Sequence, residues 1–457
     1  MDCRSTVIFH AHASPPVLMR RSTHQAEAIL RNTILSLCGA IVLAAALPAS
    51  AALSVDAKLL DMLKSNGSIT ADQYAELTAD LAKEQRQIAR STVSKTDVTE
   101  LQQKIGWATN TVVSGDIRVR QDRVEIEGLN PAPNKDRQRF RARLATISQV
   151  TPTVEAGVRI ATGNSNDVRS TNQDIDGYFT KKDLWLDRAY INWHPESVPG
   201  LKMFAGKMAQ PWFNVADAMW DNDINPEGLA AQYSRKFGVT ELFGSAGVFV
   251  LKNNVTGKGN EFHNDLRMNT AQFGVRMFPG DDYKLTLGGS VYHFYKDGFN
   301  AKTPGATPGS VAPAGLSVNG STSTEFQLYE GFGQLDVLGL PLPLSVYGQY
   351  IHNAAANGPQ GDDDTAWLLG FMTRVSEVAV NYNYRHVERN GVVGAFTDSD
   401  FAAGFTGSRG HTLRLNYNIA NNFAFTTTYF RASSDASNPK LRGADTDVLM
   451  IDLVATF

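Results

Sequence analysis

The sequence predicts an all-β protein, a transmembrane antiparallel β-barrel of about 16 strands preceded by a short α-helical or coiled-coil N-terminal segment. Three observations carry this prediction. Apolar and polar residues alternate with the period of two that is typical of strands through most of the chain. The connections between these segments alternate between short and long. After the leader, no stretch offers the roughly 18 consecutive apolar residues that a membrane helix needs.

Residues 1–51 form a predicted leader and signal peptide. Basic residues precede the apolar run Ile34–Leu47, and the small residues Ala49 and Ala51 follow it, which is the pattern of a secretory cleavage site. We expect cleavage after Ala51. An uncleaved anchor is the weaker alternative, because a run of about 14 residues is short for a membrane span. Both cysteines lie in this leader, so no disulfide is expected in the mature protein.

Residues 52–108 have the pattern of short helices. A helix is expected from Leu59 to Gly67, where glycine ends it, and Thr70–Gln73 fits a capping box for a second helix. A further short helix is expected over 94–105. The apolar spacing allows two interpretations: a short coiled coil that joins subunits or contacts the cell wall, or a loosely ordered amphipathic spacer.

The segment 109–457 is the predicted barrel. Alternation marks strands at 113–123, 138–150, 153–162, 184–194, 200–208, 227–236, 241–252, 267–277, 282–295, 323–336, 342–353, 365–375, 377–388, 410–420, 422–431 and 446–457. Many have the roughly 9–11 residues that a tilted strand needs to cross a bilayer. The strict alternation of short and long connections favours a membrane barrel over a soluble β-protein. In a membrane barrel, the tight turns lie at one end and the large loops at the other.

The polar face of the first strands is rich in arginine. Its members are Arg118, Arg120, Arg139, Arg141, Arg143, Arg159 and Arg188. Like charges this close need water and counter-charges, which a wet barrel interior supplies, so these arginines are predicted to line the pore. An arginine-rich exposed sheet is the alternative. In the segment Trp185–Trp193, strict alternation would turn either Asp187 or Arg188 toward lipid. A β-bulge would resolve this conflict, as would a position of Asp187 near the outer rim, and the sequence leaves both open.

Several stretches resemble the putative porin family of Gram-negative outer membranes. They are SGDIRVRQ, VEAGVRIATGNSND, KKDLWLDRAYINWHP, GLKMFAGKMAQPWF and the terminal phenylalanine. The resemblance implies an outer-membrane barrel that forms a water-filled channel for passive diffusion of small polar or charged solutes, with the N-terminal helices in the periplasm. It does not supply a particular solute.

The connection 209–226 is the third long loop. In general porins, which this chain resembles in strand count, that loop folds inward and narrows the pore. Its acidic residues here are Asp217, Asp221 and Asp223, and its rings are Trp212, Phe213 and Trp220. We hypothesise a constriction with the arginines on one side and this acidic loop on the other, which would favour small polar or zwitterionic solutes. The alternative is a surface loop outside the pore.

The last segment, TDVLMIDLVATF, is predicted to close the barrel by pairing with the first strand. Leu449, Ile451, Leu453 and Ala455 would then face lipid while Asp452 faces water. By resemblance, a terminal Phe457 after apolar alternation is the signal that the outer-membrane assembly machinery reads.

The sequence predicts no enzyme and no cofactor or metal, because it contains no nucleophile elbow, zinc pair or phosphate loop. Asp221–Asn225 resembles the start of a calcium loop but lacks its glycine. The formal net charge of −3 disfavours nucleic acid as a partner. Expected partners are outer-membrane lipid, small solutes, the assembly machinery and, by analogy with general porins, two further copies in a homotrimer. A structural tether that uses the helices to bind the cell wall or hold an oligomer is the alternative function.

Overall fold

The computed structural model describes residues 58–91, 110–129, 132–165, 167–297, 319–358, 360–438 and 440–457. The helical segment and the barrel are separate units and are described one at a time. The predicted leader and the predicted helix over 94–105 lie outside the described residues.

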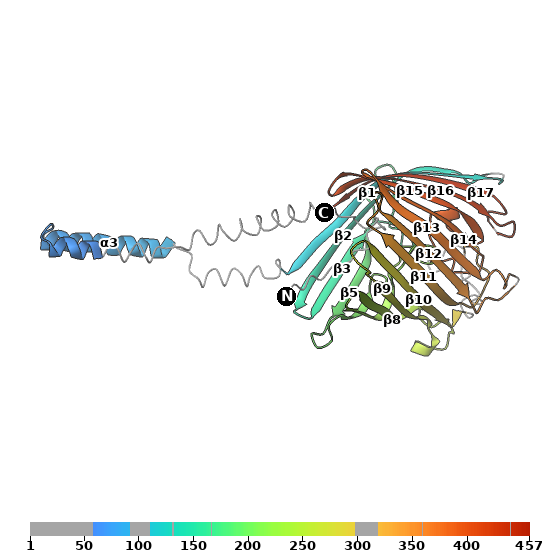
Figure 1. The fold of residues 1–457 in the computed structure, drawn as a ribbon, viewed down its shortest axis with the longest axis horizontal. Helices are drawn as coiled ribbons and strands as arrows, with labels where there is room; N and C mark the ends of the chain where they lie inside the picture. The colour runs from blue at the N-terminus through green and yellow to red at the C-terminus, as the bar shows by residue number, and fades with distance from the viewer. Residues whose placement is uncertain are drawn as a thin grey trace. The chain divides into compact units, whose positions relative to one another are not determined.

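The barrel is a closed antiparallel sheet, as predicted (Figure 1). Neighbouring strands pair in chain order, and the last strand pairs back onto the first. The wall has 16 strands, because β4 (Gln173–Asp174) is only a short strand beside β2 within the second long connection. The wall strands are β1 (Thr111–Glu127), β2 (Lys135–Thr151), β3 (Val154–Ala161), β5 (Trp185–Trp193), β6 (Leu201–Lys207), β7 (Glu227–Phe237), β8 (Thr240–Lys252), β9 (Leu266–Met277), β10 (Tyr283–Tyr295), β11 (Gln327–Val337), β12 (Leu344–Asn353), β13 (Thr365–Val375), β14 (Val378–Val387), β15 (Ser408–Ala420), β16 (Phe423–Ser434) and β17 (Asp445–Thr456).

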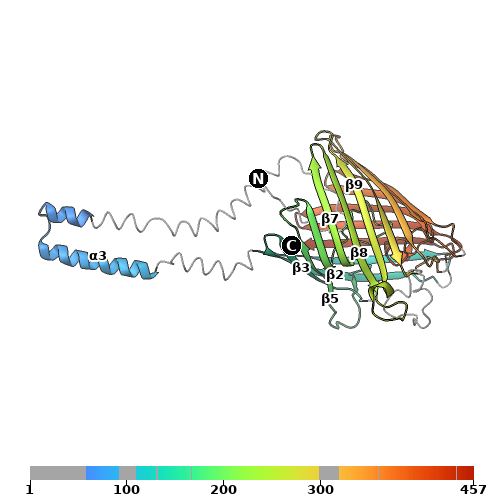
Figure 2. The same ribbon diagram turned by 90° about the horizontal axis from the view of Figure 1, so that it is seen from below.

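The strands form because their residues alternate between two environments. In β17, Leu449, Ile451 and Leu453 are exposed on the outside while Met450 and Asp452 are buried inside. Tight turns join the strands at one end of the barrel, and the long connections gather at the other, which we call the long-loop end (Figures 1 and 2). The predicted strands are all present, with ends shifted by a few residues, as at β1 and β11.

A β-bulge resolves the parity conflict in β5. Across the β3–β5 ladder, Arg159 faces Arg188 and Ile160 faces Leu186, so Asp187 is the extra residue. The bulge turns Asp187 and Arg188 to the same interior side. The side chain of Asp187 is 11% exposed there, and Arg188 is buried. Trp185 and Ile191 remain exposed on the outer face.

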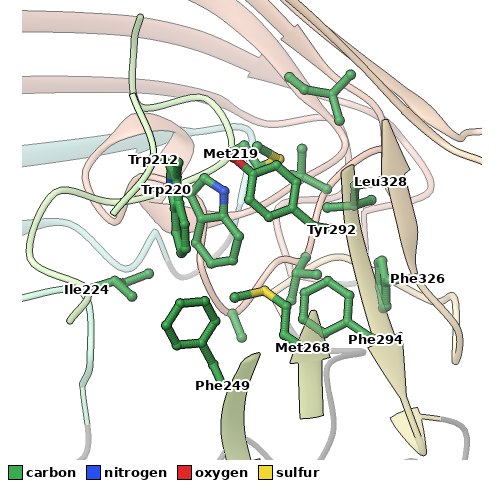
Figure 3. Close-up of a cluster of buried hydrophobic side chains, with 14 of the residues drawn as sticks. Trp212, Met219, Trp220, Ile224, Phe249, Met268, Tyr292, Phe294, Phe326 and Leu328 are labelled. Carbon is green, nitrogen blue, oxygen red and sulfur yellow. The ribbon is translucent and has the colours of Figure 1, made fainter. Parts of the chain in front are cut away.

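The largest apolar cluster lies inside the barrel and fastens the third long connection, 208–226, to the wall. Trp212, Met219, Trp220 and Ile224 of this connection pack against buried side chains of β8 to β11 (Figure 3). The wall partners include Phe249, Leu266, Met268, Tyr292, Phe294 and Leu328. This packing fixes the place of the loop inside the barrel.

The helical segment contains a helix over 58–65 and α3 (Ala71–Ser91). Gly67 separates them with φ of 73°, a conformation that favours glycine. The predicted capping box is confirmed: Thr70 N–H donates to Gln73 Oε1 at 3.0 Å, and Gln73 N–H donates to Thr70 Oγ1 at 3.2 Å. None of the helices in the described ranges has the length and apolar character of a membrane span.

Candidate functional site

The predicted arginines lie on the interior face of β1, β2, β3 and β5, and three pairs of them face each other in register. Arg118 faces Arg141 and Arg120 faces Arg139 across β1 and β2. Arg159 faces Arg188 across β3 and β5. Like charges directly opposite each other destabilise a sheet, so carboxylates are needed nearby.

The strands themselves supply most of these carboxylates. Asp116 directly faces Arg143 of β2 and lies diagonally across from Arg141: it accepts from Arg141 Nε at 2.8 Å and from Arg143 Nε at 2.6 Å. Asp452 of β17 accepts from Arg120 Nε at 2.7 Å and Nη2 at 2.9 Å, a two-pronged contact. Asp116 follows the same alternation as Arg118 and Arg120, so parity could have revealed it.

The remaining arginines of the group are held by loop and bulge residues. Arg139 Nε lies 2.8 Å from an oxygen of Asp174 in β4. The bulge residue Asp187 pairs with Arg159. Arg188 Nε donates to Asn225 Oδ1 at 2.6 Å. The arginines therefore form a nearly charge-balanced network rather than a bare positive wall.

Asp223 brings the third long connection into this network. One of its oxygens lies 3.2 Å from Arg143 Nη1, and the other accepts from the Thr171 N–H at 3.1 Å. Burial would raise the pKa of Asp223, but the guanidinium groups of Arg143 and Arg141 outweigh burial and hold the pKa well below its usual range. Asp223 is therefore charged and in direct contact with Arg143.

Asp221 has a different role. It accepts hydrogen bonds from the Ser399 N–H at 3.0 Å and the Asp223 N–H at 2.9 Å. Burial, together with the nearby carboxylates of Asp223 and Asp398, raises the pKa of Asp221 well above its usual range. Asp221 therefore holds the connection 388–407 against the connection 208–226.

Asp217 meets a cation that the sequence analysis did not single out. Arg385 of β14 lies 2.8 Å from Asp217 through Nη2 and 3.1 Å from Asp398 through Nη1. Its guanidinium also lies 4.6 Å from the centre of the Phe401 ring. Arg385 and Asn383 lie two residues apart on β14, so the alternation predicts that both face the interior. Only the structure of the long connections shows which carboxylates Arg385 contacts.

Rings and one amide fix 208–226 to the opposite wall. Trp212 is 2% exposed and its ring centre lies 4.9 Å from that of Trp220. Phe213 packs on Phe332 with ring centres 5.5 Å apart. Gln272 of β9 clamps the Phe213 backbone, accepting from its N–H at 2.7 Å and donating to its carbonyl at 2.9 Å. The loop therefore lies inside the barrel, between the arginine network and β8 to β14.

The closing strand lies as its sequence indicates. Asp116 of β1 faces Thr456 of β17, and the ladder continues to Glu127. Phe457 ends it: its N–H donates to the Gly115 carbonyl at 3.0 Å and its carbonyl accepts from the Gly115 N–H at 2.9 Å. Its ring lies so close to Gly115 that a Cβ there would meet the ring at 2.6 Å. Whether Phe457 also acts as the assembly signal stays a prediction.

Within the described ranges, no group of three His, Cys, Asp or Glu residues could hold a metal ion. The polar side chains of the interior form ion pairs and amide clamps. Such an arrangement can shape and charge a passage for solutes.

Several solved structures have a similar chain path. Pseudomonas putida OprB is 11% identical with a TM-score of 0.48, and the match covers 79% of this chain and 97% of that chain. A mutant of the Rhodopseudomonas blastica porin is 10% identical with a TM-score of 0.41, covering 76% and 100%. A loop-deletion variant of OmpT, an outer membrane protein of Vibrio cholerae, is 10% identical with a TM-score of 0.42, covering 76% and 100%.

One curated relative matches over a short stretch. "Phosphate starvation-inducible protein 1" of Pseudomonas fluorescens is 68% identical over 34 residues, which are 7% of this chain and 87% of that protein.

A family described as "Putative porin" matches residues 108–307 and 354–457, which is more than half of this chain. The matched ranges contain the arginine network, the connection 208–226 and the closing strand. Proteins of this family are typically channels without catalytic activity. The chain therefore belongs to the putative porin family and is an outer-membrane channel protein.

Proposed function

We propose that this protein forms a water-filled channel for passive diffusion of small polar or charged solutes across the outer membrane. One observation carries the proposal. The connection 208–226 lies inside the closed barrel, clamped to β9 by Gln272 and bound to the arginine network through Arg143 and Asp223. A loop held at both sides narrows a barrel without filling its whole cross-section, and charged groups beside it select solutes by charge.

The arginine network and the loop together define the proposed constriction. Its pore-lining arginines are those of β1, β2, β3 and β5, and its loop carboxylates are Asp217, Asp221 and Asp223. Because most of these charges are paired with one another, the constriction presents both signs close together. Such a local field favours small polar, zwitterionic or hydrated charged solutes over apolar ones.

The test is conduction by the purified full-length protein in a planar bilayer. We expect discrete steps of current in potassium chloride and a reversal potential that reports the charge preference. Competition by added solutes would then rank the solutes that enter. A folded barrel that gives no conductance steps would overturn the proposal.

Inorganic phosphate is a solute to include in that competition. The short match to a protein whose name records induction by phosphate starvation supports its inclusion. The arginines of the network suit the geometry of phosphate oxygens. A reduction of chloride current by phosphate, larger than that by sulfate at equal charge, is the expected sign of a phosphate preference.

A second candidate function is a structural tether, favoured by the exposed apolar side chains of the helical segment. Leu59, Met62 and Leu77 are 53%, 65% and 43% exposed. Such residues on a helix suit contact with another copy or with the cell wall. We place this segment in the periplasm, and we infer a homotrimer in which it helps to join the subunits.

Deleting residues 55–105 separates the two functions. If the shortened protein conducts as before but envelope integrity fails, the tether role is the more important one. Loss of the trimer on a native gel, with monomeric channels remaining, would assign subunit contact to the helices. Unchanged assembly and unchanged integrity would remove the tether proposal.

A further inference from the structure

A cavity of about 290 Å³ lies at the long-loop end, bordered by the connections 162–184 and 208–226 and by the ends of β8 and β9. Small-molecule sites in proteins start at about 300 Å³. The cavity is therefore of a size to hold one compact organic molecule. It adjoins the arginine network through Asp187, Asp223 and Asn225, which line it, whereas the arginines that they contact are not among the lining residues.

One side of the cavity is apolar. The lining side chains on this side are Trp220, Ile224, Phe249, Leu266, Met268 and Phe396. Figure 3 shows Trp220, Ile224, Phe249 and Met268 gathered around one space. Water in contact with such a surface is readily displaced by an apolar group of matching size, which gives the cavity a reason to take up a ring or a branched chain.

Two β-bulges direct charged residues into this same cavity. In the β8–β9 ladder, Val250 faces Arg267 and Lys252 faces Leu266, so Leu251 is the extra residue. Lys252 therefore shares the interior side of the buried Leu266. The bulge in β5 turns Asp187 inward in the same way, and both Lys252 and Asp187 line the cavity. Bulges often re-aim side chains beside functional sites.

The ion pairs around the cavity leave one positive charge over. Lys207 pairs with Glu227 at 2.6 Å, and Asp223 pairs with Arg143 at 3.2 Å. Asp187 pairs with Arg159, and Asp167 lies 3.8 Å from Arg169 Nε. The side chain of Lys252, by contrast, forms no hydrogen bond or ion pair with any residue in the described part of the chain. An ammonium group above an apolar surface is the complement of a carboxylate carried on an apolar body.

We infer that this cavity binds a small organic acid, with the apolar body against Phe249 and Met268 and the carboxylate at Lys252. The inference rests on the proposed channel function, because it makes the cavity a solute-binding subsite beside the constriction. A solute held here enters the narrow region already stripped of part of its water. The site thus favours monocarboxylates with a ring or branched chain over inorganic anions.

Benzoate is the probe for the test, with benzyl alcohol and acetate as matched comparisons. Benzyl alcohol keeps the ring without the charge, and acetate keeps the charge without the ring. Titration calorimetry on the detergent-solubilised full-length protein measures binding, and block of potassium chloride current in a bilayer measures occupancy of the channel. We expect benzoate to bind and block at lower concentration than either comparison compound.

The variant Lys252→Met keeps the length of the side chain and removes its charge. Benzoate should bind about tenfold more weakly to it, as expected for loss of one charge-assisted contact, while benzyl alcohol binding stays unchanged. Lys284→Met is the control: Lys284 is another interior lysine, 3.4 Å from Asp336 and away from the cavity lining, so benzoate binding should be unaffected.

Three results would overturn the inference: no benzoate binding, equal binding of acetate and benzoate, or full benzoate affinity in Lys252→Met. These failures are distinct from failure of the channel proposal. A protein that conducts potassium chloride but ignores benzoate lacks the subsite and remains a channel, whereas a folded protein without conductance contradicts the channel function itself.

Discussion

Arg120 of β1 and Asp452 of β17 face each other in register across the seam that closes the barrel, with two hydrogen bonds of 2.7 and 2.9 Å. Both side chains are almost fully buried, at 3% and 7% exposure. The first and last strands of the barrel are thus joined by a paired charge as well as by their backbone ladder. Asp400 adds a third member at 3.3 Å from Arg120.

Asp452→Ala should weaken the closed barrel, because it leaves the Arg120 charge buried beside a single, more distant carboxylate. Breaking a buried pair by removing one partner typically costs about 3–5 kcal/mol. Urea titration in detergent, followed by heat-modifiable gel mobility, would show the lower midpoint. The double variant Arg120→Met with Asp452→Met should recover much of the loss, since no unpaired charge remains. Equal midpoints for the wild type and Asp452→Ala would contradict the role of the pair.

Asp223→Asn should shift ion selectivity toward anions. The substitution removes the carboxylate that lies 3.2 Å from Arg143 and exposes more of the positive potential of the network. Asp221→Asn should shift selectivity less, because Asp221 accepts from the Ser399 and Asp223 backbone N–H groups and not from an arginine of the network. Reversal potentials in a salt gradient measure both effects. If neither variant moves the reversal potential, the connection 208–226 is not part of the constriction.

The docking of the connection 388–407 should depend on pH through Asp398. Burial, with the nearby carboxylate of Asp217 and despite the opposing Arg385, raises the pKa of Asp398 from 3.8 to about 6. Asp400 and Asp221 are the other carboxylates that face it. The docked loop therefore retains the proton over a pH range in which a free loop loses it.

The sign follows from this pKa. Docking of the connection 388–407 is strongest below about pH 4, where Asp398 carries its proton in both the docked and the free loop. The docking free energy weakens on the order of 2–3 kcal/mol as the pH rises through about 6. Hydrogen exchange of the Ser399 N–H, corrected for the intrinsic rate, should show less protection at about pH 7 than at about pH 4. Asp398→Asn should remove most of this change. A response that is unchanged in Asp398→Asn would assign the effect to another group.

Gln272→Ala should loosen the third long connection without unfolding the barrel. It removes both hydrogen bonds to the Phe213 backbone, while the rings of the apolar cluster stay in place. We expect noisier single-channel current with larger open levels. Gln334→Ala is the matched control. Within the described part of the chain, the side chain of Gln334 forms its hydrogen bond only with Asp336 of the same strand. Identical current traces for the two variants would show that the clamp does not limit the opening.

Removing Phe457 should reduce assembly more than it changes each assembled channel. The loss takes away two backbone hydrogen bonds to Gly115, which hold the tight-turn end of the seam. The amount of heat-modifiable protein in the outer membrane measures assembly, and single-channel conductance measures the pores that do form. Normal assembly with altered conductance would contradict this prediction and assign Phe457 to the channel instead of to assembly.

The fold could be predicted from sequence because each strand carries its own two-residue period, and the period requires no knowledge of distant residues. The same parity placed Arg118 and Arg141 on the interior face. What it could not give is contact between loops and wall. The pairing of Arg385 with Asp217 and Asp398 depends on how two long connections fold within the barrel, and alternation says nothing about such segments.

The bulges in β5 and β8 change how this protein could acquire a different solute preference. Most interior positions change chemistry by substitution, one side chain at a time. At each bulge, one extra residue lets two successive side chains share the interior face, while the pairs on both sides keep their alternation. Deletion of Leu251 would restore the regular ladder and leave Lys252 opposite Leu266 on the interior face, whereas deletion of Asp187 would leave Arg188 opposite Arg159 without the carboxylate that pairs with Arg159. The loss of one residue at either point would therefore change the interior surface without turning a neighbouring charge toward lipid.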